Sequence, residues 1–219
     1  MEPDRRRARH LAAEYIAKGD PVGWFEQLYR EAERGQSIVP WAELQANPNL
    51  LDFWQRKPLD AAGKSALKIG CGLGDDAERL TAWGFDTTAF DVSPTAIEAC
   101  RRRFPSSRVH YVAADLLDPP PGWTARFDFV LESYTLQVLP PSARTQAIRQ
   151  ATRFVAPGGF LLLIARGRDS SDPAGDMPWP LLRCELDLIE QLGLRKISFE
   201  DYYDAESPPV RRFRALYEK

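Results

Sequence analysis

Histidine, cysteine and long apolar stretches are all scarce in this chain of 219 residues. The two histidines and the three cysteines, which have no C-x-x-C spacing, predict neither a metal site nor a disulfide framework. Reduced thiols are typical of cytoplasmic proteins, so we expect a cytoplasmic location. The longest apolar run, residues 160–165, is far too short to cross a bilayer, and the N-terminus lacks the apolar segment of a signal peptide.

Acidic and basic residues are nearly balanced in number, 31 against 29. The net charge of −2 argues against a general nucleic-acid surface. The densest basic run, Arg101-Arg102-Arg103, is expected on the solvated side of a helix. The length suits one domain with a full core. We therefore expect a small-molecule substrate, and neither nucleic acid nor membrane as a partner; no pattern in the sequence predicts the oligomeric state.

A glycine cluster is the most informative feature that is present. The run from Gly70 to Gly74 follows an apolar stretch and opens a predicted helix, and Asp91 comes nineteen residues after Gly72. This is the layout of a nucleotide-binding βαβ unit. Its glycines let the backbone approach the ligand, and its acid accepts hydrogen bonds from ribose hydroxyls. An acid at this place can also be a simple helix cap.

The spacing of the glycines indicates which nucleotide binds. The chain reads G-x-G-x-G, whereas a dinucleotide fingerprint reads G-x-G-x-x-G, and Asp75 and Asp76 fall in the first turn of the helix. Carboxylates at a helix N-terminus suit the helix dipole but repel a pyrophosphate docked there. A nucleoside without phosphates fits better, and S-adenosylmethionine is such a ligand.

Strand and helix patterns alternate from residue 65 onward, which is typical of an α/β fold. Strands are expected at residues 66–69, 85–90, 109–113, 127–132, 160–165, 194–202 and 210–217, and helices at 75–83, 93–103, 142–155 and 181–192. This predicts a Rossmann-like three-layer sandwich with a seven-stranded, mostly parallel sheet whose last strand is antiparallel. Residues 61–219 form the predicted domain. Residues 1–60 form an N-terminal helical extension, which either packs on the domain or covers the ligand as a lid.

These motifs, in this order, resemble the class I S-adenosylmethionine-dependent methyltransferases from about residue 66 to the C-terminus. The resemblance implies that the glycine loop lies under the amino acid part of the cofactor, that Asp91 binds the ribose, and that Asp115 binds the adenine amine. It implies S-adenosylhomocysteine as the product. The residues expected to bind the cofactor are Gly70, Cys71, Gly72, Gly74, Asp76, Asp91, Val92, Ser93, Ala114, Asp115, Leu116, Glu132, Trp24 and Trp41.

The N-terminal aromatic motifs are similar to one branch of that class. Gly23-Trp24, Pro40-Trp41 and the loop at residues 172–180 resemble the thiopurine, thiol and halide methyltransferases, in which the N-terminal segment folds over the cofactor. Two positions depart from the pattern. Lys68 stands where most class I enzymes carry an acid, and we expect it to point past the strand end to solvent. Ala42 stands where the branch places an acid after the Pro-Trp pair.

The predicted function is methyl transfer from S-adenosylmethionine to a small-molecule nucleophile: a thiol, a halide, an amine or a hydroxyl. Such an in-line displacement needs mainly alignment and dehydration of the nucleophile. Tyr134 either orients the nucleophile or only packs, and Cys71 is expected to fill space. Two alternatives remain at this point: an NAD(P)-dependent oxidoreductase, and a non-catalytic methyltransferase-like protein that binds S-adenosylmethionine.

Overall fold

The computed structural model describes residues 5–219. Its α-helices are α1 (Arg6–Ala17), α2 (Gly23–Glu33), α3 (Pro48–Arg56), α4 (Asp75–Ala82), α5 (Pro94–Arg103), α6 (Pro141–Phe154) and α7 (Arg183–Gln191). Its strands are β1 (Ser65–Ile69), β2 (Asp86–Asp91), β3 (His110–Ala113), β4 (Phe127–Ser133), β5 (Val155–Arg168), β6 (Leu181–Leu182), β7 (Arg195–Tyr203) and β8 (Arg211–Glu218). Two short 3₁₀ turns, Pro121–Trp123 and Leu136–Val138, flank β4.

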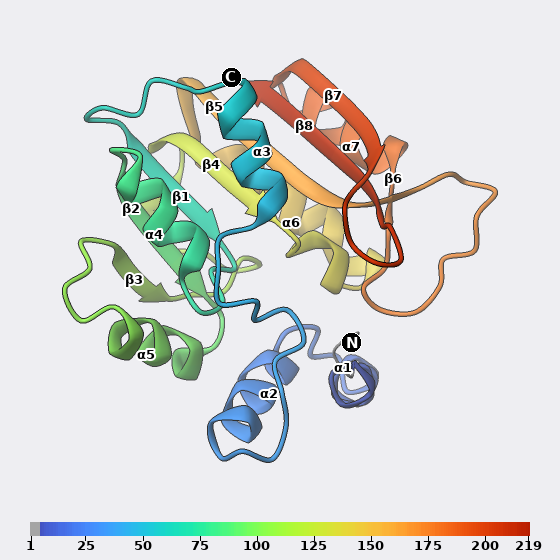
Figure 1. Ribbon diagram of the computed structural model, residues 1–219. Helices are drawn as coiled ribbons and strands as arrows, with labels where there is room; N and C mark the ends of the chain where they lie inside the picture. The colour runs from blue at the N-terminus through green and yellow to red at the C-terminus, as the bar shows by residue number, and fades with distance from the viewer. Residues whose placement is uncertain (1–4) are drawn as a thin grey trace.

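One twisted sheet organises the molecule, in the order β3-β2-β1-β4-β5-β8-β7 (Figure 1). The first five strands of this order are parallel, and β8 runs antiparallel to both β5 and β7. The strand order reverses between β1 and β4, where open α/β sheets bind their ligands. The predicted Rossmann-like α/β fold is confirmed, including its antiparallel last strand.

The described part of the chain forms eight strands rather than the seven expected. The additional strand, β6, has two residues and pairs with Gly167 and Arg168 of β5. Strand β6 has this partner because β5 extends three residues beyond its expected end. The helix expected from residue 181 therefore begins at residue 183, after β6.

Strand β5 also begins earlier than expected, at Val155 rather than at residue 160. Val155 already pairs with Phe127, and the next pair is Phe160 with Phe129, so β5 bulges between them. A Cβ on Gly159 would lie 2.9–3.0 Å from three backbone carbonyl oxygens, so a side chain cannot fit at that position. The glycine lets the bulge turn back into the ladder without ending the strand.

Helices cover both faces of the sheet and bury two separate apolar cores. On one face, α3 and α4 contribute Leu50, Phe53 and Leu80. On the other face, α6 and α7 contribute Ile148 and Leu186, among others. This is the expected three-layer sandwich, in which alternate residues of each strand enter opposite cores.

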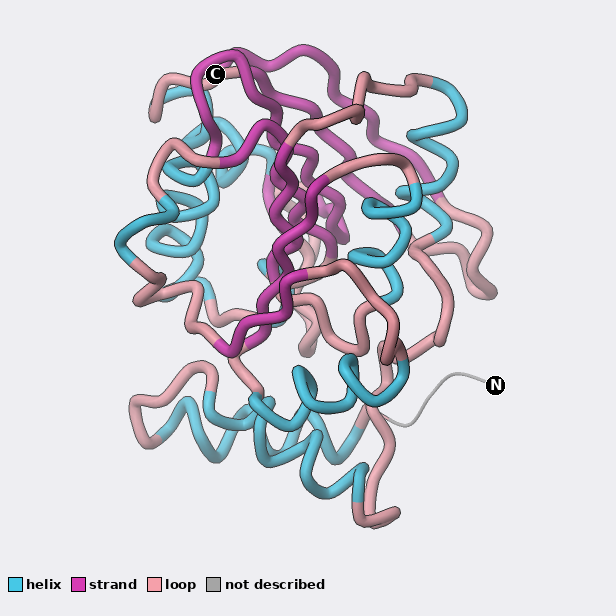
Figure 2. Tube along the Cα trace, turned by 90° about the vertical axis from the view of Figure 1, so that its left-hand side faces the viewer, coloured by secondary structure: helices cyan, strands magenta, loops and turns pink. Residues whose placement is uncertain are grey.

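The N-terminal region divides into two parts. Helix α3 packs on the sheet, whereas α1 and α2 lie below the carboxyl ends of the parallel strands, where α2 contacts α5 (Figures 1 and 2). Leu11, Trp24 and Leu28 of these two helices form a third apolar cluster with Val138 and Met177. The carboxyl edge of the sheet is thus covered by helix. None of the helices formed by residues 5–219 is both long and apolar enough to cross a membrane.

Candidate active site

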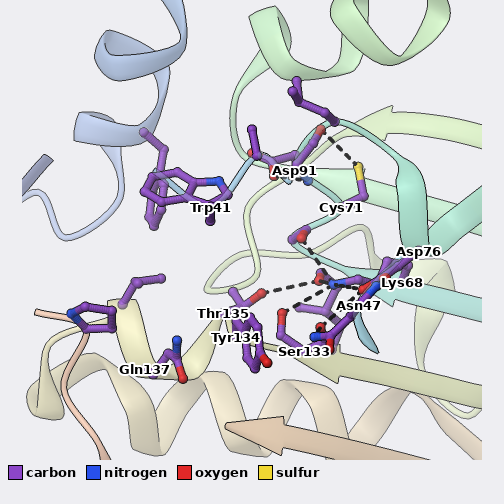
Figure 3. Close-up of a pocket in the computed structure, with 18 of the residues that line it drawn as sticks. Trp41, Asn47, Lys68, Cys71, Asp76, Asp91, Ser133, Tyr134, Thr135 and Gln137 are labelled. Carbon is purple, nitrogen blue, oxygen red and sulfur yellow. Dashed lines mark hydrogen bonds and ion pairs between the residues drawn. The ribbon is translucent and has the colours of Figure 1, made fainter. Parts of the chain in front are cut away.

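A pocket of about 200 Å³ lies at the carboxyl edge of the sheet, between the strand ends and the N-terminal helices (Figure 3). Its walls come from the loops after β1, β2, β3 and β4, from α2 and the segment after it, and from the far ends of β5 and β8. Of the residues expected to bind cofactor, or to orient the acceptor, those that line it are Gly70, Cys71, Gly72, Asp76, Asp91, Val92, Ala114, Asp115, Leu116, Trp41 and Tyr134.

The glycine loop is pressed between the segment after β4 and helix α2. Gly70 and Gly72 have φ of +56° and +54°, in the left-handed region that favours glycine. A Cβ on Gly70 would lie 2.3 Å from Thr135 Oγ1, and a Cβ on Gly72 would lie 3.2 Å from the Tyr29 hydroxyl oxygen. Both glycines therefore keep the loop low enough to leave the pocket open above it.

Asp91 ends β2 and is held by backbone amides from two directions. Its Oδ2 accepts a hydrogen bond from the Gly72 N–H at 2.9 Å, and its Oδ1 accepts one from the Ser93 N–H at 3.0 Å. Burial raises its pKa to about 6, against the lowering effect of these two bonds and of the Lys68 charge. Each carboxylate oxygen has a second lone pair, so this acid can still accept bonds from the hydroxyls of a ligand.

An apolar slot lies beside this acid. Val92 after β2 and Ala114 and Leu116 after β3 line it. Asp115 lies between the last two, and its Oδ1 accepts a hydrogen bond from the Leu117 N–H at 2.8 Å. A flat ring with one polar edge fits such a slot, because apolar side chains contact its faces and the acid receives its amine.

Lys68 is buried at the floor of the pocket, so the expectation that it points to solvent is wrong. Its side chain is 3% exposed. Its Nζ donates to the carbonyl oxygens of Ile69 at 2.8 Å, Gly70 at 3.3 Å and Ser133 at 3.5 Å. Strand β1 ends beneath the loop, and the side chain folds back under its own backbone, where these carbonyls replace water as its partners (Figure 3).

Asp76 faces the Lys68 ammonium and links it to the N-terminal region. Its Oδ2 lies 3.9 Å from Lys68 Nζ and accepts a hydrogen bond from Ser133 Oγ at 3.2 Å. Its Oδ1 accepts one from the Asn47 N–H at 2.8 Å, and Asn47 Nδ2 donates to Ser133 Oγ at 3.0 Å. Asn47 was not among the predicted site residues, although an Asn before a Pro is a helix N-cap signal.

Asp75, the other acid of the first helical turn, forms a bidentate ion pair with Arg103 at 2.8 and 2.9 Å. Its partner belongs to the basic run that we expected on a solvated face. The other two members also have partners: Arg101 donates to the Tyr111 carbonyl oxygen at 2.8 Å, and Arg102 pairs with Glu33. The run therefore ties α5 to its neighbours.

Four of the expected cofactor residues do not line the pocket. Gly74 is the N-cap of α4, where a Cβ would lie 2.6 Å from the Tyr111 hydroxyl oxygen, so it serves close packing. Ser93 is the side-chain N-cap of α5. Trp24 is fully buried between α1 and α2. Glu132 is also fully buried and has turned away from the pocket.

Glu132 instead holds the segment after β4 in place. Its Oε1 accepts hydrogen bonds from the N–H groups of Thr135 and Leu136, both at 2.8 Å. Burial raises its pKa to about 7, and Oε2 has no hydrogen-bond partner. These bonds fix the 3₁₀ turn that brings Thr135 against the glycine loop.

Tyr134 lines the pocket, but its hydroxyl is already engaged. It has φ of +68°, and its hydroxyl accepts a hydrogen bond from Asn49 Nδ2 at 2.8 Å. Burial raises its pKa to about 12. The guanidinium of Arg212 lies over its ring, 4.5 Å from the centroid. The geometry makes the ring a wall of the pocket and leaves the phenol a poor proton acceptor near neutral pH.

A family model described as a methyltransferase domain matches residues 66–159. Among curated proteins, the ubiquinone biosynthesis O-methyltransferase of Xanthomonas oryzae pv. oryzae is 32% identical over 124 residues, which are 56% of this chain and 51% of that protein. A carboxy-S-adenosyl-L-methionine synthase of Yersinia pestis is 33% identical over 103 residues, which are 43% of this chain and 38% of that protein. The chain thus spans about half or less of the length of these relatives.

Solved structures agree in fold. The N-methyltransferase NodS from Bradyrhizobium japonicum, in complex with S-adenosylhomocysteine, has a TM-score of 0.69 at 21% identity, covering 88% of this chain and 98% of that one. The 1,6-didemethyltoxoflavin N1-methyltransferase of Burkholderia thailandensis has a TM-score of 0.68 at 17% identity. The match covers 96% of this chain and 90% of that one. Residues 66–159 are therefore similar to a methyltransferase domain, and the chain shares the fold of these two methyltransferases.

Proposed function

We propose that this protein transfers a methyl group from S-adenosylmethionine to a small-molecule nucleophile. The observation that carries the proposal is the composition of the pocket. One wall combines the glycine loop with Asp91 and Asp115, and the opposite wall is built by Arg166 of β5 and Arg212 of β8. A single cavity thus has a wall suited to a nucleoside and a second wall for another molecule.

The residues of the first wall fit the cofactor. Asp91 offers lone pairs for ribose hydroxyls, Asp115 with its apolar neighbours suits adenine, and Asp76 offers a carboxylate near the loop. When bound, S-adenosylmethionine supplies an electrophilic methyl group on a sulfonium. Asp91 and Asp115 suit the positive charge of such a ligand, whereas Lys68 balances the charge of Asp76.

The remaining lining residues align the nucleophile and exclude water. Phe25, Tyr29 and Trp41 from the N-terminal region cover the pocket, and the Trp41 Nε1–H donates to the Tyr29 hydroxyl at 3.0 Å. Removal of water from a nucleophile and fixed alignment are the main contributions that an in-line displacement needs. Residues 5–47 thereby serve as a lid in this proposal.

The nucleophile in this proposal is a thiol, halide, amine or hydroxyl. The similarity of the Gly-Trp and Pro-Trp motifs to thiopurine, thiol and halide methyltransferases favours a soft nucleophile, which needs no strong base. The lining of the pocket is consistent with this chemistry, because it contains no histidine and because Tyr134 is a weak base near pH 7. The relatives named above include O- and N-methyltransferases, so similarity alone does not select the nucleophile.

Calorimetric titration with S-adenosylhomocysteine and with NAD tests the cofactor. We expect heat from the first ligand and none from the second; the reverse would support the oxidoreductase alternative. A screen of thiols, halides, amines and phenols with methyl-labelled cofactor then tests transfer. Tight binding of S-adenosylhomocysteine without transfer to any of these acceptors would overturn the enzymatic proposal in favour of a binding protein.

A further inference from the structure

Gln137 lies in the 3₁₀ turn that follows β4, and its side chain reaches the wall of the pocket (Figure 3). The residue is only 4% exposed. A carboxamide carries two N–H donors on its nitrogen and an acceptor oxygen, and each of these groups requires a partner when it is removed from water. The partners of this carboxamide therefore indicate what it can bind.

The orientation of the carboxamide is determined by a backbone donor. The Arg166 N–H of β5 donates to Gln137 Oε1 at 2.7 Å. Only the oxygen of a carboxamide accepts such a bond, so the group cannot be flipped. Because Oε1 is bound to β5, Nε2 points toward the cavity (Figure 3).

The Nε2 group keeps its hydrogen-bond donors for a ligand. Among residues 5–219, no oxygen accepts a hydrogen bond from this nitrogen, and protein atoms do not enclose it completely. When a ligand displaces water from the pocket, a ligand without an acceptor atom at this place leaves the donor unpaired. Sites built to bond a polar ligand group discriminate strongly against analogues that lack the group.

The turn that carries Gln137 is held in place from two sides. The Trp179 N–H donates to the Gln137 carbonyl oxygen at 2.7 Å. The Arg144 Nε donates to the carbonyl oxygens of Leu136 at 3.0 Å and of Leu139 at 3.1 Å. Nε2 therefore has a fixed position before any ligand binds, and such a preorganised donor orients a ligand at little entropic cost.

Apolar side chains surround this part of the pocket. Val138, the next residue of the turn, forms an apolar cluster with Met177, and Phe25 and Trp41 pack against the cluster. All four residues line the pocket. The rings of Phe25 and Trp41 lie edge to face, with their centroids 6.0 Å apart. The body of a ligand that reaches Gln137 is therefore expected to be apolar.

The polar group on that body is expected to be uncharged. The charge of Arg212 is balanced by Asp204, whose Oδ2 accepts its Nε at 2.6 Å, and by Glu206, so this arginine does not require an anionic ligand. The amide of Gln137 is neutral as well. A carbonyl oxygen or a ring nitrogen accepts its N–H without the desolvation penalty of a charge.

We propose that the methyl acceptor is an uncharged molecule whose carbonyl oxygen or ring nitrogen accepts a hydrogen bond from Gln137 Nε2, and whose apolar body contacts Phe25 and Trp41. This inference rests on the proposed methyltransferase function and specifies its substrate class. Gln137 is the specificity-determining residue in it. The hydrogen bond fixes the orientation of the acceptor, which an in-line displacement requires.

The test uses two pairs of probes of matched shape, quinoline with naphthalene and acetophenone with ethylbenzene. Only the first member of each pair has a neutral acceptor atom. Equilibrium dialysis at pH 8, on protein saturated with S-adenosylhomocysteine, gives the Kd of each probe. The Kd of the apolar member divided by that of its partner measures the contribution of the hydrogen bond, apart from any change that affects both members alike.

Gln137→Glu is the decisive variant, because a carboxylate still accepts the Arg166 N–H but has no donor. For at least one pair, the Kd ratio should fall about fivefold or more, as expected for one lost hydrogen bond. The Kd of the apolar member and that of S-adenosylhomocysteine should stay within about threefold. Gln137→Met also removes the donor, and it provides the test if the Glu variant does not fold.

Gln146→Glu is the matched control. Gln146 is exposed on α6, where its Nε2 donates to the Leu117 carbonyl oxygen outside the pocket, so the Kd ratios should not change. Unchanged ratios for both pairs in the folded Gln137 variants, or binding of none of the four probes, would overturn the inference. Failure of S-adenosylhomocysteine itself to bind would instead overturn the proposed function.

Discussion

The ammonium of Lys68 lies 3.9 Å from the carboxylate of Asp76, and the two side chains are 3% and 11% exposed. The pair occupies the floor of the pocket. At the position of Lys68, most of the class I methyltransferases that this chain resembles carry an acid. Here the acid is supplied by the first turn of α4 instead. The lysine satisfies three carbonyl oxygens around the glycine loop and balances the charge of Asp76.

Lys68→Met should lower the free energy of unfolding by about 2–4 kcal/mol, because it leaves a nearly buried carboxylate without its cation. Asp76 retains hydrogen bonds from Asn47 and Ser133, which keeps the loss at the lower end of that range. Urea denaturation measures it. The double variant Lys68→Met/Asp76→Asn should recover about 1 kcal/mol or more relative to the sum of the single losses.

Strict additivity of the two substitutions would show that the pair is not coupled. Lys64→Met is the control, because Lys64 directly precedes β1, the strand that carries Lys68. Lys64 forms an exposed ion pair with Asp60 at 3.4 Å, and such pairs contribute about 0–1 kcal/mol. Its loss should be several times smaller than that of Lys68.

Asp91→Ala should weaken the binding of S-adenosylhomocysteine by about 1–3 kcal/mol, which is a factor of roughly 5 to 150 in Kd. The carboxylate holds the glycine loop through the Gly72 N–H and, in the proposed site, also accepts the ribose hydroxyls. Calorimetry on the folded variant measures the change. Asp86→Ala, at the exposed first residue of the same strand, is the control and should bind as the natural protein does. Unchanged affinity of Asp91→Ala would contradict the ribose assignment.

The sequence predicted well what depends on local pattern. The glycine cluster, the strand that delivers Asp91 and the segment at Asp115 all line the pocket, because each follows the carboxyl end of a strand whose apolar pattern is recognisable. Lys68 was misplaced because the same pattern does not reveal whether a long side chain at a strand end turns outward or folds back.

Other site features could not be predicted because they depend on long-range register. Arg212 faces the pocket only because β8 pairs with β5 so that it stands opposite Arg166, and nothing in its own strand selects that register. The side chain of Glu132 points away from the pocket and accepts hydrogen bonds from the backbone N–H groups of Thr135 and Leu136. The bulge that lengthens β5 likewise arises from its pairing with β4.

Two buried acids should make the protein without ligand less stable as the pH rises from about 4 to about 7. Burial raises the pKa of Asp91 to about 6 and that of Glu132 to about 7, above the usual values near 3.9 and 4.3. Between these values the folded protein holds protons that the unfolded chain has released. The free energy of unfolding therefore falls with pH through this window and levels off above it.

Urea denaturation at intervals from pH 4.5 to 7.5 measures this slope, and Glu132→Gln should flatten it. Glutamine still accepts the bonds from Thr135 and Leu136 but carries no charge to bury. Glu31 and Asp201, whose pKa values are lowered to about 2, add stability with rising pH only up to about pH 5, so the fall is read above that pH. A slope equal to that of the natural protein would show that Glu132 does not titrate there. Glu98→Gln, on the exposed face of α5, is the control.

Glu26 should hold the N-terminal helices on the pocket. Its Oε2 accepts hydrogen bonds from Ser93 Oγ at 2.5 Å and from the Thr95 N–H at 3.2 Å, and its Oε1 accepts one from Thr95 Oγ1 at 2.9 Å. These groups stand at the first turn of α5, where a negative charge is also stabilised by the helix dipole. Helix α2 is thereby fastened to the side of the sheet that carries Asp91.

Glu26→Ala should therefore loosen α2 by about 1–3 kcal/mol without unfolding the domain, because the two cores on the faces of the sheet do not include this contact. Hydrogen exchange of the amides in residues 23–33 should speed up by a factor of roughly 5 to 150, and that of β4 and β5 should not change. Glu33→Ala, which removes the exposed pair with Arg102 at the end of the same helix, is the control. If α2 is the lid, the Glu26 variant will also release S-adenosylhomocysteine faster. Faster exchange with an unchanged release rate would show that the helix moves without gating the pocket.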